Sequence, residues 1–194
     1  MLNKILKPLD KVYSGNIFER MEGLESLFHD CKNKSILDVG CAEGLICYEF
    51  AKHGAGLIHG FEIDRRRVEF ANLLFQEVPI KSEFRIANIA TSFEKFEKQF
   101  SNLLLNQYDI TLYLGVYHHL IRQAPLENVH GFISALLSRT TTHFAARTNM
   151  IDQFESIILS SGFEVYSEKA KTDTVGQLKI YKRVILSPSE KINQ

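Results

Sequence analysis

The sequence predicts a single α/β domain, built on a mostly parallel sheet with helices on both faces. Its 194 residues, of which 45% are hydrophobic, are enough for one core. From Ser35 onward, short apolar runs alternate with segments of helical period, as expected for repeated strand–helix units. The clearest helical face, with apolar positions at i, i+3, i+4, i+7 and i+8, consists of Val129, Phe132, Ile133, Leu136 and Leu137.

Seven segments have the composition of strands. The first five, expected to run parallel, are residues 36–39, 57–62, 84–87, 108–114 and 143–147. Residues 163–167 and 178–186 are expected to form an antiparallel C-terminal hairpin, which completes a seven-stranded sheet. Asp64 is predicted to cap the helix after the second strand. Residues 35–186 would form this domain, residues 1–34 an arm that serves as a lid over the site, and residues 187–194 a polar tail.

The composition restricts the classes of partner. Lys plus Arg and Asp plus Glu both total 23, so no net field attracts polyanions, and nucleic acid is a disfavoured partner. The odd number of cysteines, without a C-x-x-C pair, argues against disulfides and zinc and favours a reducing compartment; they are Cys31, Cys41 and Cys47. The sequence contains no apolar run of the ~20 residues that span a membrane and no signal-peptide core, so we expect a cytoplasmic protein.

The loop after the first strand carries a glycine pattern that does not suit a dinucleotide. A G-x-G-x-x-G fingerprint starting at Gly40 would need glycines where Ala42 and Leu45 stand. Asp38 and Glu43 also bring carboxylates to a turn where a pyrophosphate would be repelled and a cation attracted. The loop therefore indicates a cationic ligand, and the alternative is an ordinary turn.

Glu62 strengthens the prediction of a ligand site. It ends the second predicted strand, 18 residues after Gly44. This is close to the ~20-residue offset of the acid that accepts hydrogen bonds from ribose hydroxyls in nucleotide-binding sheets. A single glutamate at a strand end is usually only solvated, but together with the loop it favours a nucleoside ligand.

The chain resembles the class I S-adenosylmethionine-dependent methyltransferases over residues 35–186. The likeness rests on residues 37–44 (LDVGCAEG), 60–64 (GFEID), 108–110 (YDI) and 115–120 (GVYHHL). It implies a Rossmann-like fold, S-adenosylmethionine as cofactor and S-adenosylhomocysteine as product. The implied cofactor-binding residues are Asp38, Gly40, Cys41, Ala42, Gly44, Glu62, Ile63, Asn88, Ile89 and Gly115.

Within that resemblance, three positions receive particular roles. Asp38 and Gly40 would lie near the methionine moiety, and Glu62 would bind the ribose. Asn88 would meet the adenine amino group, where Asp is commoner, although an amide oxygen accepts the same hydrogen bond. The alternative for Asn88 is a turn residue at the end of a strand.

The segment after the fourth strand indicates the chemistry of transfer. Leu114-Gly115-Val116-Tyr117 lacks the Asn/Asp-Pro-Pro-aromatic motif of many nitrogen methyltransferases. It resembles instead the histidine-containing turn of small-molecule and glycan methyltransferases, in which an imidazole takes the proton of an attacking hydroxyl. His119 is the better match and His118 the second, with Tyr117 facing the acceptor. The alternative is a structural histidine, more so for His118, and no metal ligands stand out.

A second likeness is to the methyltransferase half of the bacterial O-antigen chain-terminating methyltransferase/kinases, through residues 37–44 and 116–121. The main hypothesis is therefore methyl transfer to an oxygen, with nitrogen less favoured, of a small-molecule or glycan-like acceptor. Tyr13, Asn16 and Arg20 are candidate acceptor contacts from the arm, or surface and packing residues. The alternatives are a methyltransferase for transfer or ribosomal RNA, suggested by the basic runs at residues 65–67 and 95–98, and an inactive cofactor-binding partner subunit. The oligomeric state is not predicted.

Overall fold

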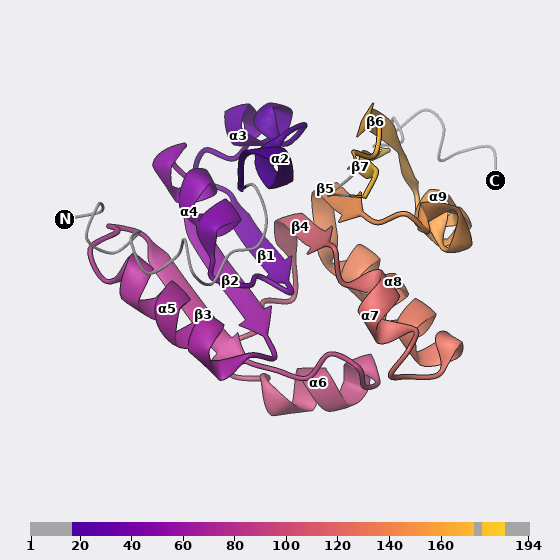
Figure 1. Cartoon of the computed structure of the whole chain (residues 1–194), viewed down its shortest axis with the longest axis horizontal. Coiled ribbons are helices and arrows are strands. Elements are labelled where there is room, and N and C mark those ends of the chain that lie inside the picture. The colour runs from indigo at the N-terminus through magenta and orange to yellow at the C-terminus, as the bar shows by residue number, and fades with distance from the viewer. Residues whose placement is uncertain (1–16, 173–175, 185–194) are drawn as a thin grey trace, which may run out of the picture.

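The computed structural model describes residues 17–172 and 176–184. A seven-stranded sheet forms the centre of the molecule, as predicted (Figure 1). Its strands are β1 (Ser35–Val39), β2 (Leu57–Glu62), β3 (Lys81–Ile86), β4 (Tyr108–Leu114), β5 (Thr140–Arg147), β6 (Phe163–Lys169) and β7 (Leu178–Arg183).

Two strands begin three residues before the predicted start, β3 at Lys81 and β5 at Thr140. β3 is an edge strand, and its exposed Lys81 and Arg85 are charged. The prediction relied on apolar runs, so it placed the start of this strand too late. β5 starts with threonines, and the Thr140 hydroxyl lies 2.7 Å from the Thr111 hydroxyl of β4. A prediction from apolar residues alone therefore missed strand residues whose polar groups form hydrogen bonds within the sheet.

The strand order is β3-β2-β1-β4-β5-β7-β6. β1 to β5 run parallel, whereas β7 lies antiparallel between β5 and β6. The antiparallel C-terminal hairpin is thus confirmed, and its second strand, β7, is the one that joins the hairpin to β5. The register places Asp38 of β1 beside Gly60 of β2 and Leu112 of β4, so the carboxyl ends of these strands meet at one edge.

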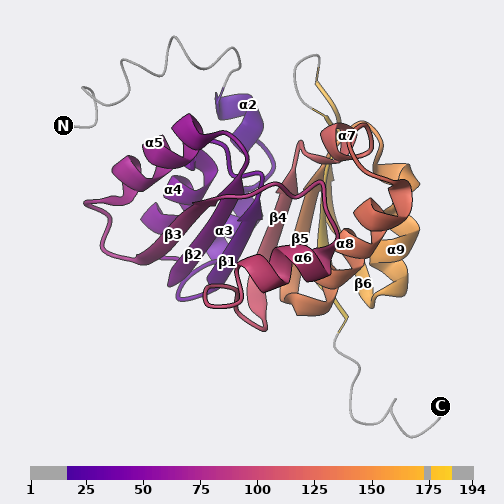
Figure 2. The same ribbon diagram turned by 90° about the horizontal axis from the view of Figure 1, so that it is seen from below.

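Helices cover both faces of the sheet (Figure 2). One face carries α3 (Glu25–Asp30), α4 (Leu45–Lys52) and α5 (Arg65–Phe75), and the other carries α6 (Phe93–Gln99), α8 (Leu126–Arg139) and α9 (Glu155–Ser160). The short elements are α2 (Ile17–Met21), α7 (Tyr117–Leu120) and the 3-10 turn η2 (Ile151–Gln153). All five residues of the predicted apolar face of α8 are buried, and the Asp64 side chain caps α5 by accepting from the Arg66 N–H.

The N-terminal arm is only partly separate from the core. Leu24, Leu27, Phe28 and Cys31 are buried in one apolar cluster with Phe50 of α4. The described part of the arm from Leu24 onward is therefore a layer of the domain, because removing it would expose this face. The predicted polar tail, residues 187–194, lies outside the described residues, as do Tyr13 and Asn16.

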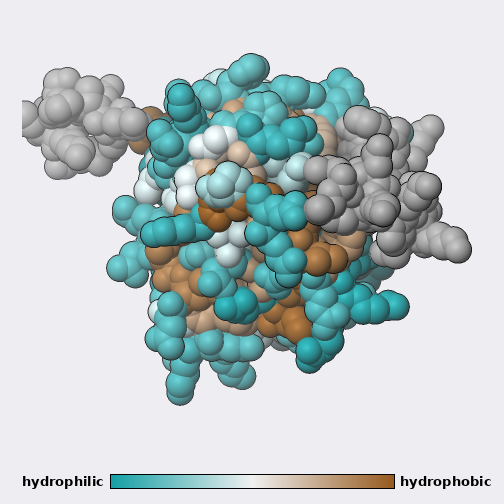
Figure 3. All heavy atoms as spheres, turned by 90° about the vertical axis from the view of Figure 1, so that its left-hand side faces the viewer, coloured by the Kyte–Doolittle hydropathy of each residue, from teal (hydrophilic) through white to brown (hydrophobic). Residues whose placement is uncertain are grey.

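The surface on the side of α5 and β3 is mainly hydrophilic, with apolar areas between the hydrophilic side chains (Figure 3). None of the helices in the described part of the chain has the length and apolar character that crossing a bilayer requires.

Candidate functional site

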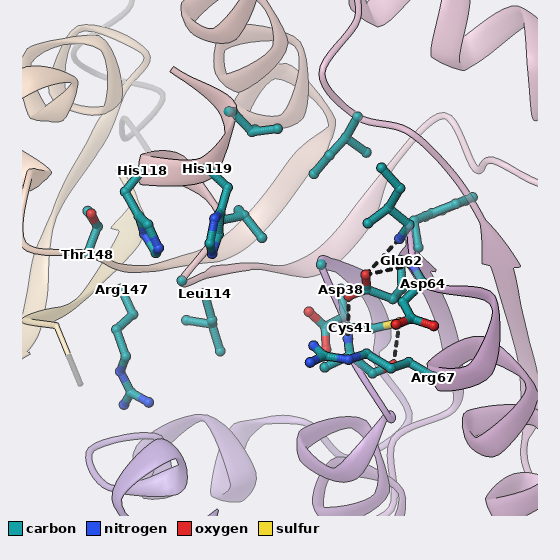
Figure 4. A pocket seen from close by; sticks show the side chains of 18 of the residues that line it. Asp38, Cys41, Glu62, Asp64, Arg67, Leu114, His118, His119, Arg147 and Thr148 are labelled. Atoms are coloured by element: carbon teal, nitrogen blue, oxygen red, sulfur yellow. Dashed lines mark hydrogen bonds between the residues drawn. The ribbon is translucent and has the colours of Figure 1, made fainter. Parts of the chain in front are cut away.

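A cavity of about 810 Å³ lies at the carboxyl ends of the parallel strands (Figure 4). Residues that follow each of the five parallel strands line it: Gly40, Ile63, Asn88, Gly115 and Thr148. Ligands of open α/β sheets bind in this crevice. Most predicted site residues meet here, namely Arg20, Asp38, Gly40, Cys41, Ala42, Glu62, Ile63, Asn88, Ile89, Gly115, His118 and His119.

The loop between β1 and α4 forms one wall of this cavity through left-handed backbone. Gly40, Ala42 and Gly44 have φ angles of 85°, 49° and 73°. A Cβ on Gly40 would lie 2.1 Å from Val116 Cγ1, so this position requires glycine. Gly44 is the N-cap of α4 and is not among the lining residues, so it shapes the loop without reaching the cavity.

Glu62 holds two turns of the site together. Its Oε2 accepts a hydrogen bond from the Ala42 N–H at 3.1 Å, and its Oε1 accepts from the N–H groups of Ile63 and Asp64 at 2.7 and 3.0 Å. Each carboxylate oxygen has two lone pairs, so the group can still accept from a ligand. The carboxylate thus fixes both the β1 loop and the β2 turn while lining the cavity.

Asp38 is the buried acid of the site, with a side chain that is 2% exposed. Burial, with a smaller contribution from the charge of Glu62, raises the pKa of its carboxyl to about 7, although a hydrogen bond from Cys47 acts in the opposite direction. A cation in the cavity would favour the ionised form. Asp38 and Glu62 form what we call the acidic half of the cavity. This half therefore suits a ligand that carries positive charge.

Glu43 does not contribute to that acidic half. Sequence analysis placed its carboxylate around the ligand-binding turn, but the side chain is buried, lies 3.4 Å from the Nε of Arg67 and is not among the lining residues. Glu43 thus forms an ion pair with Arg67 of α5. Of the two residues, only Arg67 lines the cavity. Asp38 and Glu62 remain as the acids beside the glycine loop.

The β2 and β3 ends supply a mixed apolar and amide region. Ile63, 57% exposed, and Ile89 line the cavity beside Asn88. The Asn88 Oδ1 accepts from the Ala90 N–H at 2.9 Å, so Asn88 is a turn residue and a lining residue at once. An apolar surface next to an amide can receive a flat heterocycle with polar edges.

His118 and His119 of α7 lie on the opposite wall, with ring centroids 3.9 Å apart. Burial is the main cause that lowers the pKa of His118, with smaller contributions from His119 and Arg122, so its imidazole is neutral near pH 7. Neutral imidazole can accept a proton. The labelled side chains of Figure 4 show the two histidines with Thr148 on one side and Asp38, Glu62 and Asp64 on the other.

Tyr117, expected to face the acceptor, lies in the core instead. Its side chain is fully buried, its ring packs 4.5 Å from that of Phe154, and its hydroxyl lies 3.1 Å from His130 Nε2 and donates to Gln153 Oε1. In the single turn of α7, Tyr117 points to α8 while the next two residues reach the cavity. Its position corrects the expectation of an acceptor contact.

Arg147 is a lining residue that sequence analysis missed. It ends β5, its side chain is buried, and it donates hydrogen bonds to the carbonyls of Arg20 and Glu22. Burial is the main cause that lowers its pKa to about 10. The rule that strand ends line the site could have identified Arg147, because it closes the predicted strand 143–147. It also brings Arg20, predicted from the arm, to the cavity.

The described residues contain no group of three or more His, Cys, Asp or Glu side chains that could hold a metal ion. The polar groups that line the cavity in this part of the chain are carboxylates, imidazoles, amides, guanidinium groups, the Cys41 thiol, the Thr148 hydroxyl and backbone groups.

Comparison with known proteins is consistent with this geometry. A family model described as a methyltransferase domain matches residues 30–157. The O-antigen chain terminator bifunctional methyltransferase/kinase WbdD of Escherichia coli is 26% identical over 107 residues, which are 55% of this chain and 14% of that protein. The matched part is thus a small share of the relative's length.

Solved structures share the fold. A crystal structure of WbdD superposes with a TM-score of 0.69 at 17% identity and covers 93% of this chain and 46% of its own. Magnesium protoporphyrin IX methyltransferase (ChlM) from Synechocystis PCC 6803, solved with bound SAM, gives a TM-score of 0.63 at 18% identity over 84% of this chain and 79% of its own. At these identities the likeness concerns the arrangement of the sheet and helices.

Proposed function

The chain belongs to the family of methyltransferase domains, and on that premise we propose that it transfers the methyl group of S-adenosylmethionine to an oxygen of a small-molecule or glycan-like acceptor. S-adenosylhomocysteine is the second product. The names of the relatives support this choice, since they include a methyltransferase structure with bound SAM and a methyltransferase/kinase of O-antigen chains.

One observation carries the proposal: the cavity is divided into an acidic half and an imidazole half. Asp38 and Glu62 line it beside the glycine loop, and His118 and His119 line it from α7. The sulfonium and ammonium groups of the cofactor suit the acidic half through charge-assisted hydrogen bonds. The acceptor then falls between the cofactor and the histidines.

The residues of the chain act mainly by positioning. Glu62 binds the ribose hydroxyls, Asp38 faces the charged methionine moiety, and Asn88 meets the adenine edge. When bound, S-adenosylmethionine supplies an electrophilic methyl carbon, which leaves its sulfur as the bond to the acceptor oxygen forms. His119 takes the proton that the acceptor hydroxyl loses, and the surrounding walls exclude water from the reacting groups.

An RNA acceptor is the second candidate, and the structure weakens its main support. Two arginines of the basic run 65–67 have acidic partners: Arg66 lies 3.7 Å from Asp64, and Arg67 pairs with Glu43. Paired guanidinium groups offer less charge to a phosphate backbone. An RNA methyltransferase would bind RNA with an affinity that falls steeply as salt rises.

Calorimetry tests the cofactor half of the proposal. The protein is titrated with S-adenosylmethionine and S-adenosylhomocysteine beside Asp38→Ala and Glu62→Ala, with Glu83→Gln as a control for loss of a surface carboxylate on β3. We expect binding by the parent and the control and loss of binding in both site variants. A parent protein that binds neither ligand would refute the proposal.

The acceptor half is tested with S-adenosylmethionine labelled in its methyl group. The protein is incubated with a panel of hydroxylated small molecules, oligosaccharides and, separately, transfer and ribosomal RNA, and the labelled product is analysed for O- or N-methylation. O-methylation of a small or glycan acceptor is the expected result. Labelled RNA would favour the second candidate, and binding without any transfer until a partner protein is added would favour an inactive subunit.

A further inference from the structure

A buried thiol–carboxyl pair lies beneath the acidic half of the cavity. Cys47, in the first turn of α4, places its Sγ 3.0 Å from the Oδ2 of Asp38. The cysteine is fully buried and Asp38 is 2% exposed. Among the described residues, no other group hydrogen-bonds the Asp38 carboxyl. The ionised Asp38 carboxylate only accepts, so in that state the thiol is the donor.

Resting on the proposed function, we propose that Cys47 is a positioning residue for the cofactor: its S–H bond fixes Asp38 through Oδ2 and leaves Oδ1 to meet the cationic methionine moiety. Cys47 is not among the residues that line the cavity, so it acts through Asp38 alone. A carboxylate with one tethered oxygen has less rotational freedom to lose when a ligand binds. The expected consequence is tighter cofactor binding.

The local fold explains why this thiol can reach the acid. Asp38 lies on β1 between Gly60 and Leu112, which bring no competing polar side chain to its flanks. The left-handed turn at Gly44 then starts α4 beside the strand end, and Cys47 falls on the inner face of its first turn. The pair is thus set by the strand–loop–helix unit itself.

The charges around the pair favour the same arrangement. Burial raises the pKa of the Cys47 thiol well above its usual range, so it stays a donor at neutral pH. Burial also raises the pKa of the Asp38 carboxyl, with a smaller contribution from Glu62, whereas the thiol hydrogen bond lowers it toward the ionised form. The S–H bond therefore stabilises the state of Asp38 that attracts a cation.

Other titratable groups face the same cavity, and the experiment has to separate them. They are Glu62 from β2, Cys41 from the loop, Asp64 and Arg67 from the start of α5, His118 and His119 from α7, Arg147 from β5 and Arg20 from α2. Burial keeps the Cys41 thiol protonated by raising its pKa. A change at Cys47 that alters the pH dependence of binding while these groups are retained identifies the Asp38 pair.

The test measures the affinity for S-adenosylmethionine across pH in the parent, Cys47→Ala and Cys47→Ser. Loss of the hydrogen bond from a thiol, which is a weak donor, predicts a ~5- to 10-fold weaker affinity in Cys47→Ala, with the pH midpoint of binding shifted upward. Cys47→Ser keeps a hydrogen-bond donor and should restore both the affinity and the pH midpoint of the parent protein. Cys31→Ala removes a buried thiol whose Sγ contacts the Phe28 carbonyl instead, and should bind as the parent does.

Each outcome decides the matter. Parent-like affinity and midpoint in Cys47→Ala, or a serine variant as weak as the alanine variant, would overturn the positioning role and leave the proposed function standing. A parent protein that does not bind S-adenosylmethionine would overturn both.

A second readout needs neither ligand nor a folded alanine variant. In the infrared spectrum, the S–H stretch of Cys47 should move as Asp38 titrates, and in Asp38→Asn this movement should vanish. Cys47→Ser lacks the Cys47 band and so assigns it. A Cys47 band that stays at one frequency throughout the titration would contradict the hydrogen bond on which the inference rests.

Discussion

The Ala42 N–H donates a 3.1 Å hydrogen bond to Oε2 of Glu62, which ties the loop after β1 to the end of β2. The same carboxylate accepts from the backbone at Ile63 and Asp64 through its other oxygen. The shape of the site therefore depends on this side chain, and under the proposed function cofactor binding should respond as well when it is changed.

Glu62→Gln should weaken cofactor binding and stability together. An amide nitrogen cannot accept a hydrogen bond, so at least one of the backbone N–H groups loses its partner, at a cost of ~1–3 kcal/mol. Titration calorimetry should show an affinity lower by ~10-fold or more, and scanning calorimetry a lower Tm. Glu83→Gln serves as the surface control. A Glu62→Gln protein with unchanged affinity would refute the ribose-binding role.

Gly40→Ala should destabilise the protein because the new Cβ would lie 2.1 Å from Val116 Cγ1 and the backbone at this position has a φ of 85°. The left-handed conformation costs ~1–2 kcal/mol and overpacking a further ~1–3 kcal/mol. Gly40→Ala combined with Val116→Ala should recover only the overpacking part. Urea denaturation of both variants and of Val116→Ala measures the two contributions, and a Gly40→Ala protein as stable as the parent would contradict the loop geometry.

In the ligand-free protein, the contribution of Asp38 to stability should fall as the pH rises from about 4 to 7. The folded-state pKa of Asp38 is raised to about 7 from 3.8, mainly by burial, so in this range the folded state binds a proton that the unfolded state releases. The contribution of one such group falls by ~1.4 kcal/mol per pH unit and levels off above the folded-state pKa. Denaturation of the parent minus that of Asp38→Asn isolates this slope from the histidines, and equal slopes would disprove it.

His119→Ala should lower kcat by ~10²–10⁴-fold on the acceptor found in the panel, because the proton of the hydroxyl loses its base. The Kd for S-adenosylmethionine should not change, since the cofactor is expected to contact the opposite wall. His29→Ala, at an exposed position on α3, is the control. A larger loss of kcat in His118→Ala than in His119→Ala would assign the base to His118 instead.

Arg147→Ala should loosen the segment that bears α2. The guanidinium donates to the Arg20 and Glu22 carbonyls, and its removal leaves them without that partner. Amide hydrogen exchange in residues 17–23 should become ~10-fold faster or more. Arg183→Ala is the matched control, because Arg183 donates to carbonyls at the ends of α8 and α9. Unchanged exchange near α2 would show that other contacts hold the segment.

The parts of the fold that sequence could predict are those encoded by local patterns. The apolar face of α8 and the Asp64 cap depend on spacing within one element, and both are found as expected. The gathering of Asp38, Gly40 and Glu62 follows because parallel strands present their carboxyl ends at one edge. Sequence patterns therefore identified the acidic half of the site.

The features that sequence could not predict depend on how helices and strands pack against one another and on which side of a short helix faces the core. The contact of Arg147 with Arg20 joins positions 127 residues apart, and no pattern in either segment encodes it. Tyr117 belongs to a four-residue helix, too short for a periodic signal to show which side faces the core. Cys47 meets Asp38 only because of the path that α4 takes along β1, so its hydrogen bond is visible in the structure alone.

The insertion of β7 between β5 and β6 sets the order in which the sheet can be completed during synthesis. β6 emerges from the ribosome before β7 and, within the described sheet, pairs with β7 alone, while β5 keeps an open edge until β7 arrives. A nascent chain that ends before Leu178 therefore leaves β5 with an open edge and β6 without a partner strand, and such unpaired edges favour association with other chains. Substitutions that weaken β7 should accordingly reduce the yield of soluble protein more than the activity of the molecules that do fold.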